Sequence, residues 1–205
     1  MEPVKTKIYA EPWDVDRRLS ELRLDRKLLL EVRDVAHNSS MNATPFHPAN
    51  AAGTFAYQDG SWALRDRFVD KVWQPDQTDG IEAIKCEELK VRVAFSNVDV
   101  ACNSFLIPKP RSKKGAGAER ASGGDLFGGL PQYAPRETSG WSLFYLMMDE
   151  NGAVELTRPV VKGGTFVAAV ERLYLSRADD DEQDISSKDG GNSATEFDPQ
   201  IARKK

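Results

Sequence analysis

The sequence predicts an α+β domain in which helices come first, followed by an antiparallel sheet or small OB-like barrel of about five strands. Apolar residues recur at helical spacing in the first part of the chain. From Leu89 onward they instead alternate with polar residues or form short continuous runs, which is typical of strands. Helices and strands that are segregated along a chain indicate the α+β class.

The first predicted element is a helix from Val15 to Ala36, with one apolar stripe and an opposite face dense in charge of both signs. We expect Asp14 to cap it, because a short acceptor side chain satisfies free amide groups in the first turn. Residues 41–60 contain two prolines and two glycines and are predicted to be irregular or briefly helical. A second helix is predicted from Ser61 to Trp73.

The strands are predicted in the second half of the chain. Residues 89–95 alternate in polarity, and 98–107 form the next candidate. The apolar run 141–148 indicates a buried strand, and an Asn-Gly turn joins it to 153–161. Residues 165–175 fit either a helix or a closing strand, and we interpret them as a strand.

Charge divides the chain into a neutral body and an acidic end. The net charge of the 205 residues is −4, and residues 178–205 hold eight acids against four bases, so residues 1–177 carry 24 of each. We therefore predict a single α+β domain over 1–177 and a disordered acidic tail over 178–205.

The composition predicts a cytoplasmic protein without a cofactor. The start of the chain lacks the apolar core of a signal peptide, and no apolar run approaches the length of a membrane span. The cysteines Cys86 and Cys102 suggest no disulfide framework. Neither they nor the histidines His37 and His47 have the spacing of zinc ligands.

A long loop is predicted between two strand-like runs at residues 108–140, where eleven of 33 residues are Gly or Pro. Its first part is basic, with the cations Lys109, Arg111, Lys113, Lys114 and Arg120. Such a flexible basic loop favours binding of single-stranded DNA or RNA through the phosphates, in a non-catalytic binding protein. The aromatic residues in or near the loop are candidates for base stacking: Phe105, Phe127, Tyr133 and Trp141. The acidic tail is a candidate competitor that would occupy the basic loop in place of nucleic acid.

The first alternative function is protein–protein interaction or an adaptor role. Phe127 and Leu130 form an apolar anchor within a glycine-rich stretch of the same loop. Apolar anchors in exposed segments are candidate docking points, and the acidic tail is a second candidate.

The second alternative is catalytic. Pro75-Asp76 followed by Glu88-Leu89-Lys90 resembles the PD-(D/E)xK motif of the restriction-endonuclease-like superfamily. The resemblance implies a Mg²⁺-dependent nuclease in which Asp76 and Glu88 hold the metal and Lys90 positions the attacking water.

Overall fold

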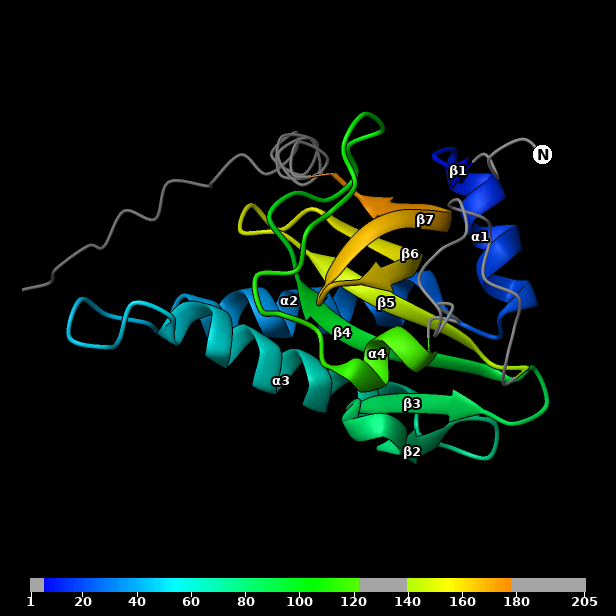
Figure 1. Ribbon diagram of the computed structural model, residues 1–205, viewed down its shortest axis with the longest axis horizontal. Coiled ribbons are helices and arrows are strands. Elements are labelled where there is room, and N and C mark those ends of the chain that lie inside the picture. The colour runs from blue at the N-terminus through cyan, green and yellow to red at the C-terminus, as the bar shows by residue number, and fades with distance from the viewer. Residues whose placement is uncertain (1–5, 122–139, 178–205) are drawn as a thin grey trace, which may run out of the picture.

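The computed structural model describes residues 6–121 and 140–177, and in these ranges it contains four α-helices and one seven-stranded sheet (Figure 1). The helices are α1 (Pro12–Glu21), α2 (Arg26–Ser40), α3 (Ala51–Phe68) and α4 (Ala116–Ala121), and a 3-10 turn, η1, spans Thr78–Gly80. The strands are β1 (Lys7–Tyr9), β2 (Gln74–Asp76), β3 (Ala83–Cys86), β4 (Val91–Asn97), β5 (Ser142–Met148), β6 (Val154–Lys162) and β7 (Thr165–Ser176).

The sheet is mixed and open. Its order is β1-β7-β6-β5-β4-β3-β2, and the pairs β1–β7 and β4–β5 are parallel whereas the other four are antiparallel. The predicted α+β class with leading helices is thus confirmed, but the sheet has more strands than expected and is not purely antiparallel. Among the described strands no pairing joins β1 to β2, so the sheet does not close into a barrel.

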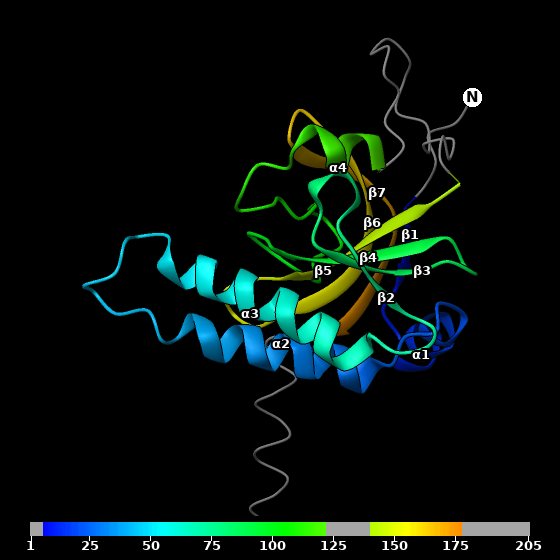
Figure 2. The same cartoon turned by 90° about the horizontal axis from the view of Figure 1, so that it is seen from below.

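Both faces of the sheet are covered (Figure 2). On one face, alternate residues of β4 such as Val93 and Phe95 join a core with the helices, including Leu29 and Leu64. On the other face, a second core that includes Tyr145 is covered by the segment after β4 and by α4. The segment that follows β4 is therefore part of the domain's second layer.

The predicted first helix is in fact two helices. Arg23 has a φ of 55°, in the left-handed region, and the side chain of Asp25 accepts a hydrogen bond from the Leu28 amide at 3.0 Å to cap the second helix. The expected cap at Asp14 is wrong, because the helix begins earlier and Asp14 lies within its first turn, paired with Arg17. The helical spacing of apolar residues continues from α1 into α2, so the sequence pattern does not reveal the short break between them.

The second helix begins ten residues earlier than predicted and ends at Phe68. It therefore contains Gly53 and Gly60, which suggested irregular structure. A Cβ added at Gly60 would lie 2.8 Å from ring atoms of Phe95, so this glycine allows α3 to approach β4 closely. Tertiary packing here overrides the low helix propensity of glycine.

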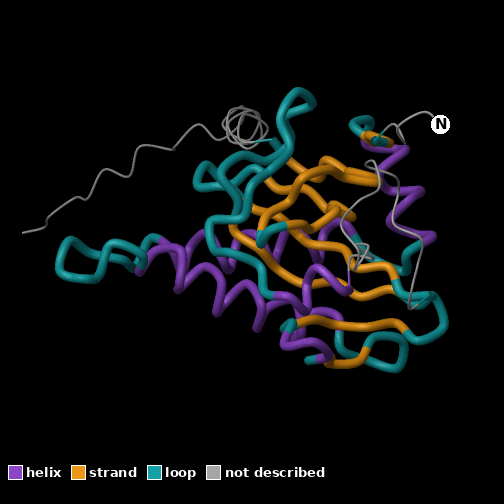
Figure 3. Tube along the Cα trace, viewed as in Figure 1, coloured by secondary structure: helices purple, strands orange, loops and turns teal. Residues whose placement is uncertain are grey.

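The predicted strands after residue 140 are confirmed as β5, β6 and β7, and the strand interpretation of 165–175 is correct. The expected strand at 98–107 is wrong. Only Val98 forms an isolated bridge, to Pro110, and Figure 3 shows the chain after β4 as loop up to α4. Side chains accept hydrogen bonds from several backbone amides of this loop. Asp99 accepts from the Lys109 amide, and Asn103 accepts from the amide of Phe105, which favours turns over a ladder.

The edge strands β1 and β2 have three residues each. β1 pairs with only the Glu171–Leu173 part of the much longer β7, and β2 contains Pro75. Neither strand was predicted, because three residues are too few to show a period.

Candidate functional site

The basic segment that follows β4 lies against the domain over its described part. The amide of Arg111 donates to the Asn97 carbonyl at 3.1 Å, and the amide of Lys114 donates to the Gly164 carbonyl at 2.8 Å. Further along, the Glu119 carboxylate accepts from the amide of Gly164 at 2.9 Å. The expectation of one continuous flexible loop over 108–140 is therefore corrected for 108–121, while 122–139 lie outside the described residues.

Packing of α4 explains why this part of the segment is ordered. A Cβ added at Gly117 would lie only 2.0 Å from the Asp79 carbonyl oxygen, so the helix sits directly on η1. Arg120 pairs with the Asp79 carboxylate at 3.0 Å across the same contact. Asp79 itself has a φ of 62°, and Arg92 lies 3.9 Å away on its other side. The sequence shows a glycine at position 117, but it does not show that Asp79 packs against it.

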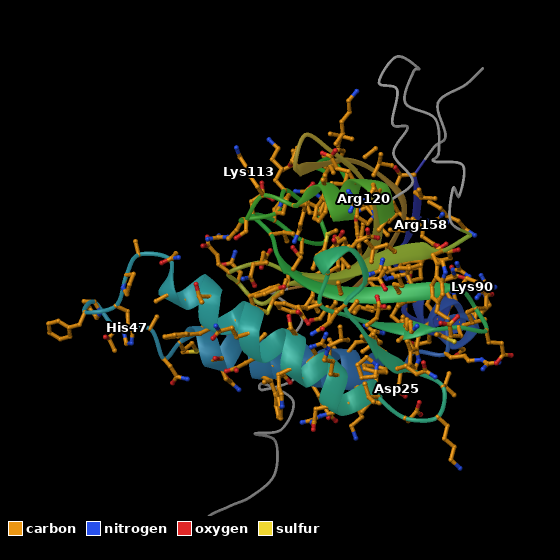
Figure 4. The ribbon with its side chains drawn as sticks, turned by 60° about the horizontal axis from the view of Figure 1, so that its bottom comes forward. Asp25, His47, Lys90, Lys113, Arg120 and Arg158 are labelled. Atoms are coloured by element: carbon orange, nitrogen blue, oxygen red, sulfur yellow. The ribbon has the colours of Figure 1, made fainter. Side chains whose placement is uncertain are left out.

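The five predicted cations have different surroundings. Arg111 pairs with Glu150 at 2.6 Å, and Arg120 pairs with Asp79. Lys114 is directed into the protein, whereas Lys109 and Lys113 are exposed, and no described group accepts from or pairs with their amino groups. Figure 4 shows Lys113 and Arg120 on the side of the molecule that carries α4.

A pocket of about 530 Å³ lies beside this segment. β3 pairs with β4 only as far as Ala94, so the last three residues of β4 extend beyond it. The pocket forms there, between the end of β4, the first turns of α3, the 79–82 turn and residues 111–115. We call it the Lys114 pocket.

The amino group of Lys114 lies in an unusual environment. Its Nζ donates to the hydroxyl of Ser96 at 2.8 Å and lies 4.9 Å from the ring centroid of Tyr145 and 5.6 Å from that of Phe166. Burial lowers the pKa of this lysine to about 8. No carboxylate of the described chain pairs with it. A desolvated ionisable group in a pocket is a candidate functional group.

The carboxylates in the pocket wall are already neutralised. Asp79 is held by Arg120, and Glu82 pairs with Arg65 at 2.5 Å. Because Arg111 is likewise paired with Glu150, Lys113 and Lys114 are the charged lining groups without an ion-pair partner among the described residues. The lining groups alone carry a net charge of +1, and the two lysines leave a balance of +2 once the paired groups outside the lining are counted.

Two further polar features line the Lys114 pocket. The first turn of α3 has no side-chain cap at Asn50, and the amides of Ala52 and Gly53 have no acceptor among the described residues. Nδ2 of Asn97 donates to the Gly53 carbonyl at 2.7 Å, while its Oδ1 is buried and finds no donor in the described part of the chain. Free amides at a helix N-terminus favour anions.

The three residues of the nuclease hypothesis do not converge. Asp76 is opposite Ala83 at the start of β3, while Glu88 follows the other end of that strand. Buried Asp76 pairs with Arg92 at 2.6 Å, and exposed Glu88 pairs with Arg23. Lys90 is held by Glu87 and lies far from Lys113 (Figure 4). The motif match thus lacks the shared metal position that its chemistry requires.

Each carboxylate of that motif has an arginine partner that explains its ionisation. The pKa of Asp76 is lowered, because hydrogen bonds from Thr78 and the charge of Arg92 outweigh the larger single effect of burial. The pKa of Glu88 is lowered by its hydrogen bond to Arg23. Groups of three or more His, Cys, Asp or Glu side chains suited to a metal are not found in 6–121 and 140–177.

The other predicted contact residues divide between described and undescribed parts. Phe127, Leu130, Tyr133 and the tail 178–205 lie outside the described residues. Phe105 is 94% exposed, which suits contact with a ligand. Trp141 instead lies under Lys90, whose Nζ is 4.9 Å from its ring centroid.

Comparisons with protein-family models, curated proteins and solved structures found no match to this chain. In the described part, none of the helices is long and apolar enough to cross a bilayer. The site must therefore be interpreted from its own geometry. Sequence reasoning found Lys113 and Lys114 through local charge, but it missed the pocket residues Ser96 and Asn97, whose importance depends on where β3 ends.

Proposed function

We propose that the chain is a non-catalytic, cytoplasmic binding protein whose ligand is single-stranded nucleic acid, held at the Lys114 pocket and the exposed lysines beside it. The observation that carries the proposal is the partly buried Lys114 amino group, which has no described carboxylate partner in a pocket of about 530 Å³. Burying a charge without a partner is costly, so an anion that completes the site is the natural ligand. The free state of Cys86 and Cys102 supports a reducing compartment.

The geometry supports a more compact interface than the sequence suggested. Two of the five cations are already paired with carboxylates, Arg111 with Glu150 and Arg120 with Asp79. We therefore assign phosphate contacts chiefly to Lys109, Lys113 and Lys114, while Arg111 and Arg120 fix the segment in place. Tyr57 is 40% exposed in the wall of the Lys114 pocket and provides an aromatic face for a base.

The test is binding of short fluorescent single-stranded DNA and RNA, measured by anisotropy at about 50 and about 200 mM salt. The variant is Lys109→Gln/Lys113→Gln. The matched control is Lys27→Gln/Lys71→Gln, which removes the same charge from two exposed lysines elsewhere. Each lost phosphate contact lowers the logarithmic salt slope by about 0.7 for a single strand, so we expect a decrease of about 1.4 only in the first variant. Absence of binding by the unaltered protein at low salt, or equal behaviour of the two variants, would refute the proposal.

A protein partner is the second candidate, and the exposed pair Phe105 and Leu106 favours it. These side chains are 94% and 53% exposed. Their loop is held from below by Arg172, which donates to the Asn103 and Leu106 carbonyls at 2.7 and 2.9 Å. A fixed, exposed apolar pair is typical of a docking point. Cross-linking from the neighbouring exposed position 104 that captures one defined protein, and is lost when Phe105→Ser is added, would support this alternative.

A further inference from the structure

We propose that the Lys114 pocket binds a phosphate monoester, in particular the phosphate at the 5′ end of a nucleic-acid strand. This inference rests on the proposed function and makes it more specific, because an internal phosphate and a terminal phosphate present different chemistry. An internal phosphodiester carries one negative charge, whereas a phosphate monoester carries about 1.5 to 2 at pH 7.

The first argument is charge balance. Lys113 and Lys114 line the Lys114 pocket, and their charges have no described partner. The acids of the same wall, Asp79 and Glu82, are paired with Arg120 and Arg65. Two unmatched positive charges fit a group that approaches two negative charges better than they fit a singly charged linkage. A carboxylate ligand would likewise match only one of them.

The second argument is the supply of hydrogen-bond donors. An ammonium group has three N–H donors, and Ser96 is the one described acceptor for that of Lys114. The free amides of Ala52 and Gly53 lie in the wall of the same pocket, at the start of an 18-residue helix. A terminal phosphate offers three oxygens outside its ester bond, and such oxygens are strong acceptors. The donors therefore suit a phosphate with several free oxygens.

The third argument concerns the nucleoside beyond the phosphate. At about 530 Å³, the pocket is within the range of sites that hold small organic ligands and exceeds what an inorganic ion requires. Tyr57 provides a partly exposed ring at its rim, on which a base can stack. These features favour a nucleotide over a phosphate ion alone.

The experiment compares oligonucleotides of one sequence that carry either a 5′-phosphate or a 5′-hydroxyl. We expect the 5′-phosphate strand to bind about tenfold more tightly, which one or two charge-assisted hydrogen bonds can provide. Lys114→Met should abolish that preference, and Lys113→Gln, an exposed change that does not disturb packing, should reduce it. Lys27→Gln serves as the control and should leave the preference unchanged.

The outcomes separate the two proposals. Equal affinity for both strands, with salt-dependent binding retained, would overturn the terminal-phosphate inference and leave the nucleic-acid function intact. Failure of both strands to bind would overturn both proposals. Competition identifies the ligand's source: a nucleoside 5′-monophosphate should displace the labelled strand at concentrations where inorganic phosphate does not. Equal displacement by inorganic phosphate would refute the nucleotide part of the inference.

Discussion

Replacement of Lys114 by methionine should make the protein more stable at neutral pH, although it removes the central group of the candidate site. The folded protein holds this amino group at a pKa of about 8, against 10.5 in a solvated lysine. That difference corresponds to about 3 kcal/mol of unfavourable free energy for burying the charged form. The cation–π contacts with Tyr145 and Phe166 offset about 0.5–2 kcal/mol of this unfavourable free energy. Methionine fills similar volume without a charge, so we expect a gain of about 1–3 kcal/mol at pH 7.

The sign of the pH dependence follows from the same values. Between pH 8 and 10.5 the unfolded chain holds the Lys114 proton and the folded chain does not, so raising the pH through this window stabilises wild type. The methionine variant lacks this contribution. The gain in unfolding free energy of Lys114→Met over wild type should be complete below about pH 8 and should vanish by about pH 10.5.

The assay is urea denaturation of wild type and Lys114→Met at pH 7, 8.5 and 10, with the difference in unfolding free energy taken at each pH. Other titrating groups cancel in that difference. Lys113→Met is the control, because its side chain is exposed and its change should stay within about 0.5 kcal/mol. If Lys114→Met is less stable than wild type at pH 7, the ammonium is compensated in the folded state and our reasoning is wrong.

Two other stability predictions test the packing. Gly60→Ala should destabilise the protein by about 1–3 kcal/mol, because the added Cβ would lie 2.8 Å from the buried Phe95 ring. Gly53→Ala, whose added Cβ would have its nearest neighbour at 3.7 Å, should leave stability unchanged or raise it by up to about 1 kcal/mol. Thermal unfolding that ranks the two variants in the opposite order would contradict this account. Arg172→Met should lower the unfolding free energy by about 3–5 kcal/mol, because it leaves the buried carboxylate of Glu155, now 2.7 Å from Arg172, without its ion-pair partner. Changing both residues to apolar ones should recover part of that loss, as measured by denaturant unfolding. No recovery would contradict an electrostatic origin of the loss.

The elements that the sequence predicted correctly have a strong local period or a clear turn. β5, β6 and β7 were found because apolar runs are separated by Asn151-Gly152 and Gly163-Gly164. The break at Arg23 was missed because a left-handed residue leaves no mark on the apolar spacing. The parallel pairing of β4 with β5 was missed because the long connection between them reads as loop.

The candidate site shows the same division between local and distant information. The unusual charge of residues 109–120 is a local property and is visible in the sequence. That Lys114 is partly buried while Lys113 is exposed depends on Tyr145 and Phe166, which lie far along the chain. Arg111 and Arg120 were expected to face a ligand, and their partners Glu150 and Asp79 become neighbours only through the fold. Local composition locates a site of this kind but does not assign roles within it.

The two short strands at the borders of the sheet also bear on self-association. A sheet border with free amides and carbonyls can recruit a strand from another molecule and extend without limit. Here one border ends in a strand that carries Pro75, which lacks an amide, and the other in a strand that begins with Lys7, whose charge resists stacking against a copy of itself. The described sheet thus presents little backbone for intermolecular strand exchange, and a change that detaches Lys7–Tyr9 would uncover the flank of β7 and encourage fibril-like growth.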